Sequence, residues 1–233
     1  MKKPYIKKFS GISGFKVFIV DGEYIRENMD EEFTNFGQHY LFDFIPKNEF
    51  WIDKERVGWE YKYYINSMLT INRLLAKGMK RDDAIKIADR QEKSEREKSR
   101  FIKKRIKLRK YPKKLIDSVH KDLLQKYSTE KVKVWVVSGE VVRSLFFLDF
   151  TEGGHSYVYS FIPKDEVWID DDVEPDELKF VLLHELHERN LMSKRMKYEP
   201  AHARSSKIEY YCRKHKGEIN KKLKSEIKKN NRS

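Results

Sequence analysis

Short hydrophobic runs along the chain predict strands that are separated by polar turns. The runs are rich in β-branched and aromatic residues, and Gly, Pro, Asn and Asp gather between them. A glycine-containing loop at 151–154 and a proline turn at 163–165 mark two of the boundaries. We expect strands at 16–20, near 141–150, at 157–162 and at 167–169.

Two helices are predicted after the last of these strands. Pro175 and Asp176 favour a first helical turn, because proline is tolerated there and acids suit the positive end of the helix dipole. This helix is expected to extend to about residue 194, and a second one from about residue 199 past Cys212. The pattern is therefore a small, antiparallel sheet followed by a helical hairpin, which is an α+β arrangement.

The same pattern occurs twice in the chain. Residues 40–53 read YLFDFIPKNEFWID and residues 157–170 read YVYSFIPKDEVWID, with nine of the fourteen positions identical. Chance would supply about one identity at ordinary amino-acid usage. The offset of 117 residues continues without a gap, so that 15–26 aligns with 132–143. The sequence predicts a tandem duplication of one small α+β module.

The repeat divides the chain into four segments. The first module covers residues 1–92 and the second covers 132–217. A basic connector, 93–131, joins them, and we expect it to be helical up to Pro112 and again over 116–127. The lysine-rich tail, 218–233, is expected to fray.

Positive charge is the main feature of the composition. The formal net charge is +13, which favours polyanions such as nucleic acid, although excess lysine can also serve solubility or thermal tolerance. Residues 100–114 hold nine basic residues and no acid, interleaved with apolar ones, as suits a helix that lies on a polyanion. The nucleic-acid contacts that we expect are Arg100, Lys103, Lys104, Arg105, Lys107, Arg109 and Lys110.

Cysteine usage and hydropathy indicate a cell interior. Cys212 is the only cysteine, which excludes an intrachain disulfide and a cysteine-rich zinc site. The first ten residues are basic but lack the apolar core of a signal peptide. No run approaches the roughly 18 apolar residues of a membrane span. We expect a cytoplasmic protein, and the sequence indicates no particular oligomeric state.

The second module carries a cluster of His and Glu residues that could hold a metal. His184 and Glu188 are four residues apart and share one face of the predicted helix, whose neighbouring positions are almost wholly apolar. Buried imidazole and carboxylate groups need partners, and a divalent metal is one. His202 returns on the second helix. Together the three have the His2Glu composition of several catalytic zinc sites.

Further residues complete the predicted site. Glu209 is a fourth ligand or a carboxylate that orients a ligating histidine, and Glu185 is placed to act as general base on a water molecule. His187 lies beside them, and His155 is expected on an exposed loop. A hairpin turn near residue 196 would place His202 about one helical turn, roughly 5.4 Å, away from the level of the cluster.

Residues 178–209 resemble the zincin metallopeptidases, whose active helix carries H-E-x-x-H with the glutamate as base. Here LLHELHE gives H-E-x-x-E, and His202 alone supplies the second histidine. The resemblance implies zinc, peptidase activity with Glu185 as base, and an edge strand beside the active helix from which His155 would alternatively approach. FIPKDEVWID followed by LLHELHER and an Ala-His pair is also similar to uncharacterised phage- and microbe-encoded proteins.

The first module lacks these residues. It has Ser67, Met68, Ile71 and Ile85 at the positions of His184, Glu185, Glu188 and His202, as expected of a buried site that lost its ligands. The four residues of the second module are therefore expected to form one unit. Three interpretations of that unit remain open: a hydrogen-bond network, a structural metal site, and a hydrolytic zinc site.

Two functions are compatible with these features. The first is a zinc-dependent hydrolase, in particular a peptidase that acts on a protein substrate, with the first module as an inactive partner. The second is a non-enzymatic, sequence-tolerant nucleic-acid-binding protein whose His/Glu cluster is structural. Phosphate binding should weaken steeply with salt, whereas metal binding should not.

Overall fold

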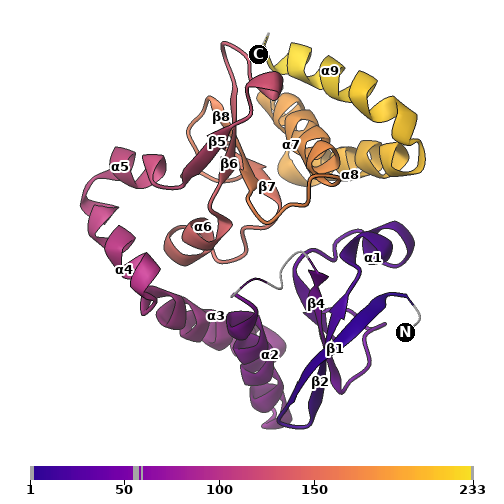
Figure 1. Cartoon of the computed structure of the whole chain (residues 1–233), viewed down its shortest axis with the longest axis vertical. Coiled ribbons are helices and arrows are strands. Elements are labelled where there is room, and N and C mark those ends of the chain that lie inside the picture. Colours follow the sequence, from indigo (N-terminus) through magenta and orange to yellow (C-terminus); the bar gives the residue numbers. More distant parts are fainter. Residues whose placement is uncertain (1–2, 55–57, 59, 232–233) are drawn as a thin grey trace. The chain divides into compact units, whose positions relative to one another are not determined.

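The computed structural model describes residues 3–54, 58 and 60–231, and the chain forms two compact units, Met1–Lys107 and Leu108–Ser233. Each unit contains one four-stranded sheet and the helices that follow it (Figure 1). From the first strand of each sheet onward, the strands and α-helices follow in the same order in both units. The expected α+β fold, built by duplication of a sheet-and-helix module, is therefore confirmed.

The first unit contains β1 (Tyr5–Ile12), β2 (Phe15–Val20), α1 (Gly22–Asn28), β3 (Phe36–Gln38), β4 (Glu49–Asp53), α2 (Tyr61–Ala76), α3 (Arg81–Glu97) and α4 (Arg100–Ile106). A 3-10 turn, η2 (Lys107–Lys110), follows α4.

The second unit contains α5 (Pro112–Asp117), β5 (His120–Leu123), η3 (Gln125–Tyr127), β6 (Lys133–Val137), α6 (Gly139–Leu145), β7 (Gly153–His155), β8 (Glu166–Asp170), α7 (Leu178–Ser193), α8 (Tyr198–Lys214), η4 (Lys216–Glu218) and α9 (Ile219–Asn230). The helical hairpin expected after the sheet is α7 and α8, which confirms that prediction. Among the described residues, no helix is long and apolar enough to cross a membrane.

The two sheets share one strand order, β1-β2-β4-β3 and β5-β6-β8-β7. The outer pairs are antiparallel, but the two central strands of each sheet run parallel, with Val17 opposite Phe50 and Val134 opposite Val167. The expectation of an antiparallel sheet is therefore wrong, and both sheets are mixed. A parallel pair needs a long crossover, and the segments that contain α1 and α6 provide it.

The strand expected near 141–150 is a helix in the structure. Every residue of α6 is buried, including the polar residues Glu140, Arg143 and Ser144. Because polar and apolar positions are buried alike, their pattern does not distinguish a buried helix from a buried strand. Arg143 of α6 donates to Asp170 at the end of β8, and Arg26 of α1 donates to Asp53 in the same way. This buried ion pair links the helix to the sheet in both units.

The third expected strand is displaced along the chain. Residues 157–162 form turns, and β7 (Gly153–His155) overlaps the end of the glycine loop that the sequence predicted at 151–154. A side chain at Gly154 would overlap the ring of Tyr159, which folds back over the strand. The backbone N–H of Tyr159 donates to the carbonyl oxygen of His155 at 2.9 Å. Position 154 therefore requires glycine, because the ring of Tyr159 approaches the strand too closely for any side chain there.

The connector and the tail both contribute to the folded units. Residues 120–123 form the edge strand β5 rather than part of a helix over 116–127. The tail does not fray, because residues 219–230 form α9. Ile219 and Leu223 of α9 are buried in the same core as α7, since their spacing of four places them on one helical face.

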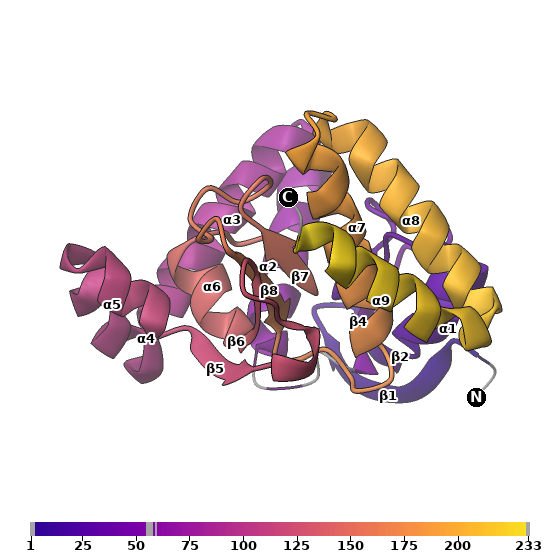
Figure 2. The ribbon, with the colours of Figure 1, turned by 90° about the horizontal axis from the view of Figure 1, so that it is seen from above.

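The core of the second unit fixes the orientation of α7. Leu182, Leu183 and Leu186 pack with Val134 and Ile169 of the sheet. α8 and α9 lie beside α7 (Figure 2). The apolar side of α7 therefore packs in the core. Its polar residues lie on the other sides of the helix, which contact α8 and α9.

Candidate metal centre

Three side chains from two helices converge in the second unit. His184 and Glu188 stand one turn apart on α7, and His202 comes from the second turn of α8. His184 Nε2 lies 3.1 Å from His202 Nδ1, His202 Nδ1 lies 3.0 Å from Glu188 Oε2, and His184 Nε2 lies 3.7 Å from Glu188 Oε2. The helices thus close the gap of one turn that the sequence left between His202 and the cluster.

The spacing of these three atoms fits one face of a tetrahedral metal site. Zinc binds imidazole nitrogen and carboxylate oxygen at about 2.0–2.2 Å, which places neighbouring ligand atoms of a tetrahedron about 3.3 Å apart. The observed separations, 3.0, 3.1 and 3.7 Å, lie on both sides of that value. A single ion could therefore contact all three atoms with only small adjustments of the side chains.

Hydrogen bonds alone do not satisfy the same three atoms. An imidazole nitrogen carries either one hydrogen or one lone pair in the ring plane, so it makes one well-directed hydrogen bond. His202 Nδ1 faces both His184 Nε2 and Glu188 Oε2 at hydrogen-bond distance. No placement of hydrogens therefore makes both contacts hydrogen bonds. A bound cation, in contrast, could accept a lone pair from each of the three atoms.

The partly buried carboxylate of Glu209 orients His184 from the side of the ring that faces away from the cluster. Glu209 Oε2 accepts a hydrogen bond from His184 Nδ1 at 2.8 Å, which leaves Nε2 to face the cluster. Arg213 donates to Glu209 at 2.8 Å and to Glu177 at 2.9 Å, so the carboxylate is itself held in place. Carboxylate–histidine pairs of this kind fix the tautomer and direction of metal-ligating histidines. Glu209 therefore suits an orienting role better than that of a fourth ligand.

His155 reaches the cluster from the sheet. It lies at the end of β7 and is fully buried, so its expected position on an exposed loop is wrong. Its Nδ1 accepts the backbone N–H of Tyr157 at 3.3 Å, and its Nε2 lies 3.1 Å from Glu188 Oε1. One carboxylate oxygen of Glu188 thus faces the two other histidines, and the second oxygen faces His155.

Glu185 lies on the other side of Glu188. Carboxylate oxygens of Glu185 and Glu188 and a ring nitrogen of His155 lie within 4.8 Å of one another. Gly153 leaves room for Glu185, since a Cβ atom there would sit 3.0 Å from its Cγ. Burial raises the pKa of Glu185 to about 8, with the negative charge of Glu188 adding to the effect and His184 opposing it. In the absence of a metal, Glu185 therefore holds a proton at neutral pH.

The charges of the other residues in the cluster favour the binding of a cation. Burial opposes the ionisation of Glu188, but the three surrounding imidazoles outweigh it and hold the pKa of this carboxyl far below its usual range. Burial likewise opposes a charge on His184, but Glu188 and Glu209 raise its pKa well above the ordinary value. The pKa of His155 is lowered by burial, which keeps it neutral. The site thus has two anionic carboxylates in contact with imidazoles.

Other predicted site residues lie elsewhere. His187 points away from the cluster, and its Nδ1 lies 3.2 Å from Glu226 of α9. In the basic connector, Arg105 is half-buried with its guanidinium 3.9 Å from the ring centre of Phe101. The other basic residues expected to contact nucleic acid are exposed: Arg100, Lys103, Lys104, Lys107, Arg109 and Lys110.

Sequence reasoning missed the arginine that supports Glu209. Arg213 and Glu177 have counterparts in the first unit, where Arg96 donates to both Glu60 and Glu92. All three positions match at the repeat offset of 117 residues, so the alignment contained this information. An arginine paired with two glutamates is thus part of the scaffold of both modules. The His/Glu cluster is found in the second module alone among the described residues.

The first module has filled the corresponding space. Met68 and Ile71 are buried at the positions of Glu185 and Glu188, and Gln38, which replaces His155, accepts a hydrogen bond from Asn72. Over the residues that the structure describes, no group of metal-ligating side chains occurs in this module. No protein-family model, curated protein or solved structure matches the chain.

Proposed function

We propose that the second module binds one zinc ion through His184, Glu188 and His202 and that the chain is a zinc-dependent hydrolase, in particular a peptidase. The observation that supports this is the triangle of donor atoms with edges of 3.0, 3.1 and 3.7 Å. Three protein ligands leave one tetrahedral position for water or substrate, as catalytic zinc sites require. The side chain of His202 is 30% exposed, so this position is within reach of solvent.

Each residue then has a distinct part in hydrolysis. Zinc held there would act as a Lewis acid on the scissile carbonyl and lower the pKa of the attacking water. Glu185 would take the proton from that water and pass it to the leaving nitrogen of the peptide bond. Burial raises the pKa of Glu185 to about 8 in the metal-free protein, and the positive charge of a bound zinc ion would lower this pKa, so that the ionised carboxylate could accept the proton. Glu209 and His155 would hold His184 and Glu188 in position.

Metal content is the first test. We would measure zinc by elemental analysis in the untagged full-length protein and in a His184→Ala, Glu188→Ala double variant, after each is supplied with zinc and dialysed. We expect about one zinc per chain in the wild type and none in the variant. A His187→Ala variant is the control, since His187 faces Glu226 and should leave the zinc content unchanged. Absence of zinc from the wild type would leave a hydrogen-bond network and end the proposal.

Hydrolysis is the second test and depends on the first. Peptide-library cleavage by the zinc-loaded protein would be compared with a Glu185→Gln variant of the same zinc content. We expect the variant to lose at least about 100-fold in rate, in line with the usual contribution of a general base. If the wild type holds zinc but cleaves nothing, or if Glu185→Gln cleaves equally well, the metal is structural and the peptidase proposal fails.

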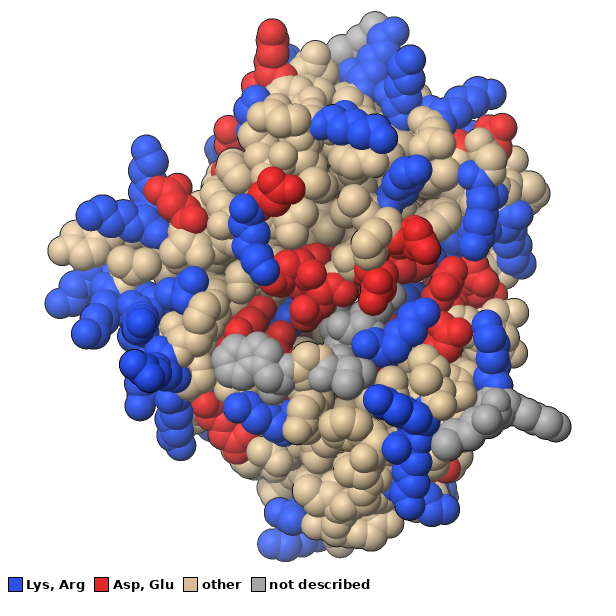
Figure 3. All heavy atoms as spheres, viewed as in Figure 1, with Lys and Arg blue, Asp and Glu red and all other residues tan. Residues whose placement is uncertain are grey.

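Nucleic-acid binding is a second candidate function, favoured by the exposed cations of α4. Lys103 and Lys104 are exposed on this helix, and Lys and Arg side chains gather over it (Figure 3). Reversing both charges should weaken binding to DNA and reduce its salt dependence, because two phosphate contacts are lost. Zinc content should stay unchanged. Binding that is flat with salt would exclude this candidate.

A further inference from the structure

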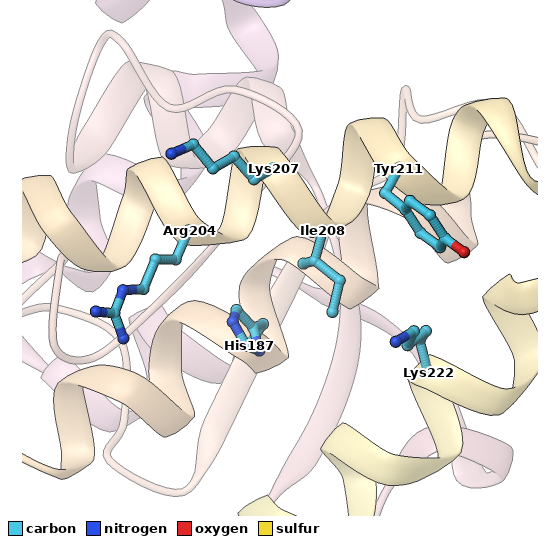
Figure 4. Close-up of a pocket in the computed structure, with 6 residues that line it drawn as sticks. All are labelled: His187, Arg204, Lys207, Ile208, Tyr211 and Lys222. Carbon is cyan, nitrogen blue, oxygen red and sulfur yellow. The ribbon is translucent and has the colours of Figure 1, made fainter.

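A groove of different chemistry lies on the other side of the α7–α8 pair. It has a volume of about 390 Å³, which is in the range of ligand pockets (Figure 4). α8 supplies most of its lining, and α7 and α9 supply one residue each. The lining residues are His187, Arg204, Lys207, Ile208, Tyr211 and Lys222. None of them belongs to the His/Glu cluster, so the groove is a separate feature of the second unit.

The groove is basic at both ends and apolar in the middle. Arg204 and His187 lie toward one end, Tyr211 and Lys222 toward the other, and Ile208 lies between them (Figure 4). The aliphatic side chain of Ile208, in the middle of the groove, suits a ligand with an apolar or aromatic part. The cations at each end suit a ligand with more than one anionic group.

Acids close to the groove are paired with other residues. Glu218, four residues before Lys222, lies 4.0 Å from Lys221. Of the described residues that line the groove, none is acidic. Glu226 lies beneath it, only 2% exposed, and is paired with His187 at 3.2 Å and with Lys229 at 2.5 Å. On α8 the exposed Lys214 follows Tyr211 by three residues and shares its side of the helix. A polyanion that follows the groove would therefore meet positive charge along its length.

Tyr211 gives the groove an aromatic wall. It is 44% exposed and stacks on His215, with ring centres 4.3 Å apart and an angle of 18° between the planes. Lys222 lies 5.8 Å from the centre of the same ring. An exposed aromatic ring beside cations offers a surface for stacking, and proteins that bind single strands combine these two features.

We propose that this groove binds single-stranded nucleic acid, with backbone phosphates at Arg204 and Lys222 and a base stacked on Tyr211. A single strand fits better than a duplex, because only an unpaired base offers its face to the ring. Cations at both ends of the groove fit a chain of phosphates better than one phosphate group. The site is independent of zinc and of the basic residues on α4.

The experiment measures binding of the full-length protein to a fluorescently labelled oligothymidylate of about 20 nucleotides by fluorescence anisotropy. EDTA is present throughout, so that the metal site does not contribute. We expect a Kd that rises steeply with salt. Tyr211→Ala should weaken binding roughly 5- to 100-fold, whereas Tyr211→Phe, which keeps the ring, should bind like the wild type.

Charge reversal separates the groove from general electrostatics. Arg204→Glu with Lys222→Glu should weaken binding more than Lys103→Glu with Lys104→Glu on α4, although the net charge changes equally. Equal losses in the two pairs would overturn the proposal, as would no binding by the wild type or no effect of Tyr211→Ala. The proposal would also be overturned if a duplex or a mononucleotide, at equal phosphate concentration, competed as strongly as the single strand does.

Discussion

His184 Nε2 lies 3.1 Å from His202 Nδ1, although the two residues are 18 positions apart and belong to different helices. Glu188 Oε2 also lies 3.0 Å from His202 Nδ1. One imidazole nitrogen makes only one well-directed hydrogen bond, so His202 Nδ1 cannot hydrogen-bond to both neighbours. A shared cation would resolve that conflict.

Zinc should stabilise the wild type against unfolding. Ligand at 100 times its Kd adds about 2.7 kcal/mol to the free energy of unfolding when the unfolded chain does not bind it. Thermal unfolding with and without excess zinc should therefore show a Tm several degrees higher for the loaded protein. His202→Ala should abolish the shift, and His187→Ala should preserve it. An equal shift in all three proteins would place the bound zinc outside the cluster.

Glu209→Gln should weaken zinc binding by about 10- to 100-fold, because the loss of an orienting carboxylate has that effect at other metal sites. Glu209 Oε2 lies 2.8 Å from His184 Nδ1, so the substitution acts through the histidine. The matched control is Glu92→Gln in the first module, where no metal ligand depends on the carboxylate. Competition with a chromophoric chelator measures both affinities. Equal losses in the two variants would indicate a general effect on folding.

His155→Gln should also weaken zinc binding, but less than Glu188→Ala does. Gln is the natural residue at this place in the first module, which makes the substitution compatible with the fold. Without the imidazole, the pKa of Glu188 should rise, because His155 is one of the groups that hold it low. The pH below which zinc is released should therefore move upward. An unchanged release curve would show that His155 does not position Glu188.

Glu185→Gln should stabilise the metal-free protein in a pH-dependent way. Burial raises the pKa of Glu185 from 4.5 to about 8. The folded state thus keeps its proton over a range where the unfolded chain has lost it, and the free energy of unfolding falls as pH rises between about 4.5 and 8. The advantage of the variant should grow across that window and level off above it. Urea unfolding at several pH values measures this, and a constant difference would contradict the raised pKa.

Transfer of the ligands into the first module should create a second zinc site. Ser67→His, Ile71→Glu and Ile85→His place the three ligands on α2 and α3, where Glu92 is already held by Arg96. We expect about two zinc ions per chain, and lower stability than the wild type without zinc, because a carboxylate replaces a buried isoleucine. The same graft with Glu92→Gln should bind its zinc more weakly. A folded graft that still holds one zinc would show that the two scaffolds differ.

The repeat alignment predicted the internal equivalence that the structure shows. Both sheets have the same strand order, and Arg26–Asp53 recurs as Arg143–Asp170. The alignment could not predict that α6 is a helix, because all of its residues are buried, Glu140 and Arg143 included, and its polar positions therefore do not mark a solvent-facing side. β5 was missed for a different reason. Its residues, HKDL, are polar, and only pairing with β6 makes them a strand.

For the candidate site, the sequence by itself determined which residues belong together. The spacing of His184 and Glu188 on one helical face, and the loss of both from the first module, are enough to identify the cluster. The tertiary structure decided the rest. It brought His202 within 3.1 Å of His184, buried His155 beside Glu188 and turned His187 toward α9. Local spacing fixes a helical face, but the crossing of two helices depends on the packing of the whole core.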